Sequence, residues 1–194
     1  MARDRTFPAP ASRAGSTRIL TLPFLVLMAG LVAWFPAAAQ TPPRLAASKY
    51  FPERTEFALL QGPLVRDGKP WSLADQKGKF VAIVLWSVDC RYCYEELPDL
   101  HAFWARHKAK GFELVGLSVD DSAEEVREYL ARYRKLVFPV LWRMQDGVSD
   151  GFARAVGTPT LYIVDRQGEI VFKRFGQLRE EHYAWIAEQL ERTR

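Results

Sequence analysis

A run of seven apolar residues, Phe80–Trp86, constrains the fold more than any other part of this sequence. The run is continuous and rich in β-branched residues, which predicts a strand buried on both faces. A helical pattern follows at 95–110, and a second apolar run follows at 112–119. Two buried strands joined through a helix form a βαβ unit, so we expect parallel strands with a right-handed crossover. The sequence therefore predicts an α/β fold.

Further elements flank this unit. The Asp67-Gly68 pair predicts a β-hairpin near the start of the domain, with a break in its first segment at Gly62-Pro63. Ser122 and Glu125 have capping-box spacing and predict the start of a helix. The elements expected after it are an edge strand at 137–142, a short helix at 148–156, paired strands at 160–164 and 170–175, and a closing helix at 180–191. Together they predict a central mixed sheet flanked by helices.

Composition excludes several classes of protein. The formal net charge of the 194 residues is +4, yet four of the 27 basic residues and only one of the 23 acidic residues lie in 1–39. The rest of the chain is nearly neutral and lacks the local basic excess of a nucleic-acid-binding surface. The two cysteines exclude a disulfide-dense scaffold and a zinc site of four cysteines from one chain.

The first forty residues have the order of an export signal. Four arginines precede an apolar segment at 19–39, and this segment ends in three alanines before Gln40, an A-x-A cleavage pattern. A retained membrane anchor is the alternative, because a segment of this length can span a bilayer. We expect a signal peptide or anchor at 1–39, a proline-rich linker at 40–55 and one domain at 56–194. Either alternative places the domain in the periplasm, where thiols tend to be oxidised.

The candidate chemistry lies at Cys90 and Cys93, directly after the first apolar run. The pair begins the following helix, whose unpaired N–H groups and partial positive charge favour a thiolate. We therefore expect a lowered pKa for the Cys90 thiol and greater coverage of Cys93, one turn later. Such a pair can open and close a disulfide reversibly, which suits thiol–disulfide exchange. A purely structural disulfide, or half of a zinc site completed by histidines, is the alternative.

A second candidate is Pro159, in the segment Gly-Thr-Pro-Thr at a strand entry. A proline there is commonly only an edge or turn residue. Beside a cysteine pair we expect a cis peptide bond before Pro159. That bond would leave the backbone of Thr158 free to pair with an extended substrate segment.

These features together resemble the thioredoxin superfamily. The residues that carry the resemblance are Trp86 at the strand end, the Cys-x-x-Cys pair, Glu96 and Pro98 in the helix, and the Gly-Thr-Pro-Thr segment before a hairpin. The sequence is most similar to the TlpA/ResA/DsbE-like extracytoplasmic branch, which has an N-terminal hairpin, here 57–79, and an inserted helix and strand, here 120–142. The resemblance covers residues 55–192 and implies a thioredoxin-like fold.

The resemblance also implies roles for individual residues. Cys90 corresponds to the attacking cysteine and Cys93 to the resolving cysteine of a thiol-disulfide oxidoreductase, which uses this redox-active pair and no cofactor or metal. Pro159 corresponds to the cis proline packed against the pair. Glu96 corresponds to the usual acid of the active-site helix, and we assign it a modulating role. The residues assigned to substrate binding are Thr158, Pro159, Arg91 and Tyr92.

The implied partners are exported proteins that contain disulfides and a membrane thiol electron donor of the DsbD/CcdA kind. Such a donor favours use of the protein as a reductase. No nucleic acid is expected as a partner, and contact with the membrane is expected only if the N-terminal segment is retained.

Three positions depart from the usual pattern of this branch. Asp89 stands where an aromatic residue is usual, and Arg91-Tyr92 replaces Glu-Pro or Gly-Pro between the cysteines. Thr160 follows Pro159, whereas the cytochrome c maturation subgroup has Pro-Glu-Thr. We assign Asp89 a modulating role, because its charge opposes a Cys90 thiolate. The alternative is an exposed helix cap.

Two other functions remain open. One is a redox-inert or copper-binding module, a metallochaperone on the same fold. Copper carriers of the Sco type have wider cysteine spacing and a later histidine, to which His182 is a poor match. The other is a peroxidase, since Ser87 precedes Cys90 by three residues, but the upstream peroxide-binding proline-threonine pattern is absent.

Overall fold

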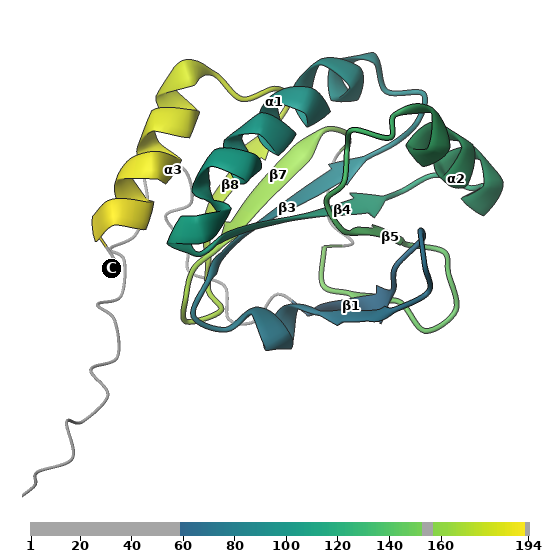
Figure 1. Cartoon of the computed structure of the whole chain (residues 1–194), viewed down its shortest axis with the longest axis horizontal. Coiled ribbons are helices and arrows are strands. Elements are labelled where there is room, and N and C mark those ends of the chain that lie inside the picture. Colours follow the sequence, from purple (N-terminus) through teal and green to yellow (C-terminus); the bar gives the residue numbers. More distant parts are fainter. Residues whose placement is uncertain (1–58, 153–156, 193–194) are drawn as a thin grey trace, which may run out of the picture. The chain divides into compact units, whose positions relative to one another are not determined.

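The computed structural model describes residues 59–152 and 157–192, which are built around a five-stranded mixed sheet (Figure 1). The sheet order is β5-β4-β3-β7-β8. The strands are β3 (Phe80–Trp86), β4 (Phe112–Ser118), β5 (Val140–Trp142), β7 (Thr160–Val164) and β8 (Ile170–Phe175). Strands β3, β4 and β5 are parallel, whereas β7 and β8 are antiparallel to their neighbours. The predicted fold class is confirmed.

The predicted βαβ unit is present. Helix α1 (Arg91–His107) connects β3 to β4, and these strands pair in parallel from Phe80 opposite Phe112 to Trp86 opposite Ser118. The helix begins four residues earlier than expected, because the Cys90 side chain caps it. It continues into the short helix η2 (Lys108–Lys110) and stops at Gly111, whose φ of 85° favours glycine.

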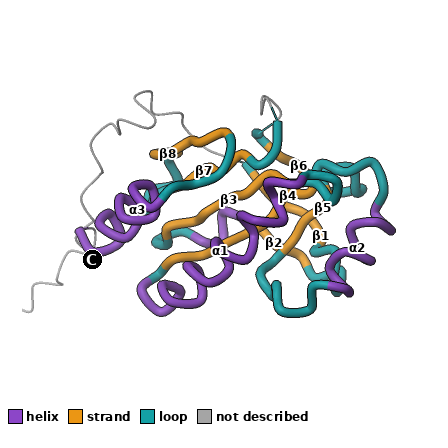
Figure 2. The backbone as a smooth tube through the Cα atoms, turned by 90° about the horizontal axis from the view of Figure 1, so that it is seen from above, coloured by secondary structure: helices purple, strands orange, loops and turns teal. Residues whose placement is uncertain are grey.

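Both faces of the central strand are buried, as its composition predicts. Alternate side chains of β3 enter two separate apolar cores. One core contains Ala82, Val84 and Trp86 and is covered by α1, α2 (Ala123–Arg132) and α3 (Glu180–Arg192). Figures 1 and 2 show α1 between α3 and α2 over this face. The other core contains Val81, Ile83 and Leu85 and is covered by the N-terminal hairpin.

The hairpin consists of β1 (Leu60–Pro63) and β2 (Pro70–Ser72), followed by the short helix η1 (Leu73–Gln76). It confirms the predicted turn, in which Gly68 has a φ of 70°. The expected break at Gly62-Pro63 is wrong, because both residues pair with β2, opposite Trp71 and Pro70. Helix α2 is capped as predicted, since Ser122 Oγ accepts a hydrogen bond from the Glu125 N–H at 3.3 Å.

The helix expected at 148–156 is wrong for its first part. Strand β6 (Ser149–Asp150) pairs with β1 instead, and residues 153–156 lie outside the described residues. Asp150 favours this conformation because its carboxylate accepts two hydrogen bonds from Arg143, both 3.0 Å, and one from the Phe152 N–H. Pairing with a strand distant in sequence thus overrides the local helical pattern.

The expected signal peptide or anchor at 1–39 and the linker at 40–55 lie outside the described residues. Within residues 59–152 and 157–192, no helix is long and apolar enough to cross a bilayer.

Candidate active site

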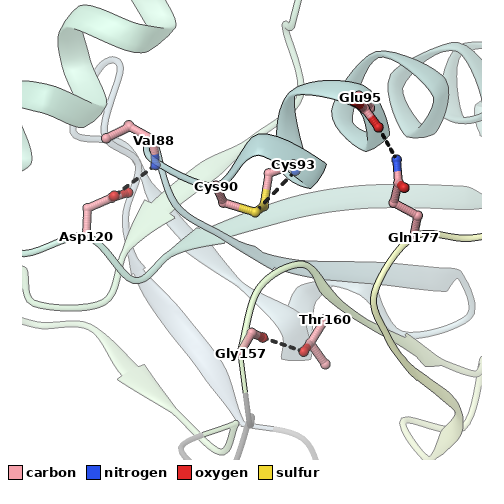
Figure 3. The surroundings of a disulfide bond; sticks show 8 residues. All are labelled: Val88, Cys90, Cys93, Glu95, Asp120, Gly157, Thr160 and Gln177. Atoms are coloured by element: carbon pink, nitrogen blue, oxygen red, sulfur yellow. Dashed lines mark hydrogen bonds between the residues drawn. A yellow bond between two sulfur atoms is a disulfide. The ribbon is translucent and has the colours of Figure 1, made fainter.

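The two cysteines lie where the central strand passes into α1. Cys90 is the N-cap of the helix, and its Sγ accepts a hydrogen bond from the Cys93 N–H at 3.2 Å (Figure 3). The sulfurs form a disulfide, with the two Cα atoms 5.2 Å apart. The Cys90 sulfur is therefore held against the N–H groups of the first helical turn, which stabilise negative charge.

The two cysteines differ in exposure. Cys93 is 1% exposed and belongs to the core beneath the helices, whereas Cys90 lies only partly buried at its edge. Arg91 and Tyr92 lie between them and are exposed. Asp89 is also exposed but does not cap the helix, since Cys90 occupies that position. The alternative role of Asp89 as a helix cap is therefore wrong.

A buried carboxylate holds the loop before Cys90. Asp120 is 8% exposed, and its Oδ1 accepts a hydrogen bond from the Val88 N–H at 2.9 Å (Figure 3). Its Oδ2 accepts a second bond from the Ser118 hydroxyl at 2.7 Å. Its backbone carbonyl accepts a third from the Trp142 indole at 2.7 Å. The loop is thus fastened to the ends of two neighbouring strands, β4 and β5.

Asp120 is missing from the sequence-based site, although a signal for it exists. It follows β4, just as the cysteines follow β3, and the carboxyl ends of adjacent parallel strands meet at one edge of a sheet. A polar residue directly after the second strand of a βαβ unit therefore lies near the residues that follow the first strand, as Asp120 lies near the loop before Cys90.

The Gly-Thr-Pro-Thr segment lies at the same edge. Thr160 on β7 pairs with Leu85 on β3, so Pro159 is placed beside the strand end that leads to Cys90. The peptide bond between Thr158 and Pro159 is cis, as expected. Pro159 is buried and Thr158 is partly exposed. The Thr160 hydroxyl donates to the Gly157 carbonyl at 2.6 Å and closes the turn (Figure 3).

Glu96 lies one turn after Cys93 and is 5% exposed. Its Oε2 accepts a hydrogen bond from the Leu178 N–H and its Oε1 accepts one from the Tyr183 hydroxyl, both at 2.9 Å. Burial raises the pKa of this carboxyl; the two hydrogen bonds oppose the shift in part, and the nearby Asp99 adds to it. Sequence analysis missed Tyr183, which lies 87 residues away on α3. The exposed Glu95 beside it accepts a bond from Gln177.

The described residues include no group of three or more His, Cys, Asp or Glu side chains placed to hold a metal ion. The histidines considered for a zinc site are therefore not gathered at the cysteine pair.

A mixed sheet whose central strand leads into a cysteine-capped helix, with a cis proline at the same edge, defines the thioredoxin-fold class of proteins. Residues 54–173 match the AhpC/TSA family, and the chain belongs to that family. The resemblance to the TlpA/ResA/DsbE-like branch is also confirmed by the similarities of sequence and fold described below.

The thiol-disulfide oxidoreductase ResA of a Bacillus cereus strain is 30% identical over 121 residues, which are 59% of this chain and 65% of that protein. The chain thus spans about 65% of the length of this relative. The sporulation thiol-disulfide oxidoreductase A of Bacillus subtilis is 26% identical over 166 residues, or 84% of this chain and 93% of that protein.

A crystal structure from Chlorobium tepidum, of a protein assigned as the thiol:disulfide interchange protein DsbE, has the same fold. The TM-score is 0.61 at 23% identity, covering 72% of this chain and 96% of that chain.

Proposed function

We propose that this protein is an extracytoplasmic thiol–disulfide oxidoreductase that reduces disulfides in exported proteins. One observation carries the proposal: the partly exposed Cys90 sulfur caps a helix, and its disulfide partner Cys93 is buried one turn later. The names of the ResA and sporulation relatives support the same activity.

The reaction begins with the reduced pair. The Cys90 thiolate attacks one sulfur of the substrate disulfide, forming a mixed disulfide and releasing the other substrate sulfur as a thiolate, which takes up a proton. Cys93 then loses its proton and attacks the Cys90 sulfur, releasing the second substrate thiol. Two electrons pass to the substrate, and the protein is left as the Cys90–Cys93 disulfide. A membrane thiol donor of the DsbD/CcdA kind returns two electrons and restores the dithiol.

The surrounding residues assist these steps. The backbone of Thr158, next to Pro159, pairs with the extended substrate chain, while Arg91 and Tyr92 contact it from the helix side. Glu96 modulates the pair from within the helix, since its carboxyl is buried one turn from Cys93 and burial raises its pKa. Asp89 modulates the pair through its charge.

The decisive experiment measures the reduction potential of the pair by equilibration with glutathione, together with reduction of a disulfide-bonded protein substrate. We expect a potential on the reducing side and catalytic turnover when a dithiol donor is supplied. Failure of the pair to exchange with glutathione would contradict the proposal. Stoichiometric copper in the purified reduced protein would instead support the metallochaperone alternative.

The proposed location is the periplasm, after cleavage before Gln40. The basic, apolar and alanine-rich order of residues 1–39 supports it. Sequencing the N-terminus of protein from the cell envelope tests it. An intact N-terminus in the membrane fraction would establish an anchored protein that faces the periplasm, and a cytosolic protein would contradict both forms.

A further inference from the structure

A pocket of about 420 Å³ lies between α1, the helix that begins after Cys90, and the end of α2. Its lining includes three tyrosines in mutual ring contact, together with Pro98 and Leu136. The Tyr129 ring lies 5.4 Å from Tyr94 and 4.5 Å from Tyr133, measured between ring centroids. Tyr129 is buried, whereas Tyr94 is 40% exposed and Tyr133 is 39% exposed. Part of each of these two side chains is therefore available to a ligand.

The rim of this pocket carries one sign of charge. Its charged lining residues are Arg132, Arg134 and Lys135, all exposed, and no acidic side chain lines it. A neighbouring hollow is lined by three acidic residues, Asp89, Glu125 and Glu128, and by one basic residue, Arg132, which it shares with the pocket. The acidic hollow includes the residue before Cys90, and the basic pocket lies farther along α1. The acidic excess near Cys90 and the basic excess farther along α1 give a bound chain a preferred direction.

The pocket is within reach of a substrate held at Cys90. Tyr94 and Pro98 line it, and they lie four and eight residues after Cys90 along α1. At a rise of 1.5 Å per helical residue, this is about 6–12 Å along the helix axis. An extended peptide covers such a distance with about two to four residues. A side chain three or four positions from the substrate cysteine can therefore enter the pocket.

We propose that this pocket binds an acidic–aromatic segment of the substrate protein, located three to five residues from the cysteine under attack. The aromatic side chain packs against Tyr94 and Tyr133, and the carboxylates that follow it face Arg132, Arg134 and Lys135. The pocket volume suits one aromatic side chain with its neighbours. The inference rests on the proposed function and adds a substrate class to it.

The test uses two peptides, Cys-Gly-Ser-Phe-Asp-Asp and Cys-Gly-Ser-Phe-Lys-Lys, each joined to glutathione through its cysteine. The reduced protein passes two electrons to each mixed disulfide, releasing peptide thiol and glutathione, and becomes the Cys90–Cys93 disulfide. At low salt we expect the acidic peptide to be reduced about fivefold faster than the basic one. High salt should remove most of this preference, because exposed charges are screened.

Three variants locate the effect. Reversing the rim charges with R132E, R134E and K135E together should invert the preference. Arg127→Glu is the matched control, because Arg127 lies on the same helix outside the pocket and pairs with Glu124 at 3.1 Å. It should leave the preference unchanged. Tyr133→Ala should slow the reduction of both peptides. It should not slow the reduction of a third peptide in which serine replaces phenylalanine.

Equal rates for the acidic and basic peptides would overturn the pocket proposal and leave the proposed function intact. Absence of reduction of every peptide and of glutathione disulfide would overturn the proposed function and, with it, this inference. If the rim variant changed the protein from dimer to monomer in sedimentation without altering peptide preference, the pocket would belong to self-association and the substrate proposal would be wrong.

Discussion

The backbone N–H of Val88 donates a hydrogen bond to the buried carboxylate of Asp120 at 2.9 Å, 32 residues along the chain. This bond fixes the loop between the central strand and Cys90. The same carboxylate accepts a bond from the Ser118 hydroxyl, so one side chain fastens the loop to the end of β4. The position of the reactive sulfur therefore depends on a residue outside the cysteine motif.

Replacing Asp120 with alanine should destabilise the protein by about 2–4 kcal/mol, because the partly buried Val88 N–H and the buried Ser118 hydroxyl lose their acceptor. Urea unfolding of the oxidised protein measures this. The exposed neighbour Asp121 provides the control, and Asp121→Ala should change stability by less than about 0.5 kcal/mol. Equal effects of the two substitutions would show that the loop does not depend on Asp120.

The unequal burial of the cysteines predicts different outcomes for their serine variants. Cys90→Ser should abolish disulfide reduction, because Cys93 is too buried to attack a substrate. Cys93→Ser should keep the attack but accumulate mixed disulfides at Cys90, since no resolving thiol remains. Mass spectrometry of the trapped mixed disulfides distinguishes the two variants. Adducts on Cys93 in the Cys90 variant would reverse the assigned roles.

Asp89 is exposed and is not the helix cap, so the influence on Cys90 that we propose for it acts through its charge. Replacing it with asparagine removes a negative charge next to the sulfur, which should lower the pKa of the Cys90 thiol and stabilise the reduced state. The pair should become more oxidising by about ten to twenty millivolts. Thiolate absorbance titration and glutathione equilibration measure the two effects.

Glu125→Gln is the control for Asp89→Asn, because Glu125 lines the same hollow from α2. Glu125→Gln should change the pKa of the Cys90 thiol and the reduction potential of the pair less than Asp89→Asn does. No change in pKa or potential for Asp89→Asn would remove Asp89 from the mechanism.

The local parts of the fold and site could be predicted from the sequence. The strand Phe80–Trp86, the cysteine pair and the turn at Pro159 each have a signal within a few residues. The parts that could not be predicted depend on contacts distant along the chain. Strand β6 exists because β1 lies beside it, and Glu96 is hydrogen-bonded to Leu178 and to Tyr183 on the last helix, 82 and 87 residues away. Local pattern does not contain such pairings.

The buried Glu96 predicts a pH dependence of stability. Burial raises its pKa above the ordinary value of 4.5, so the folded protein retains this proton at pH values where the unfolded chain has lost it. Folding then takes up a proton. The stabilisation is fully present below about pH 4.5 and is lost as the pH rises through the pKa of the folded state. Replacing Glu96 with glutamine removes this titration while keeping one acceptor and one donor for Leu178 and Tyr183.

The free energy of unfolding of the oxidised protein, minus that of Glu96→Gln, should therefore fall as the pH is raised from 4 to 8. Urea unfolding of both proteins across this pH range measures the difference. The contributions of the titratable groups that both proteins share cancel in it. Glu95→Gln is the matched control for the substitution itself, because it makes the same change at the exposed neighbouring position on α1. If the Glu96→Gln difference stayed constant with pH, folding would not raise the pKa of Glu96, and a modulating role that depends on this raised pKa would be wrong.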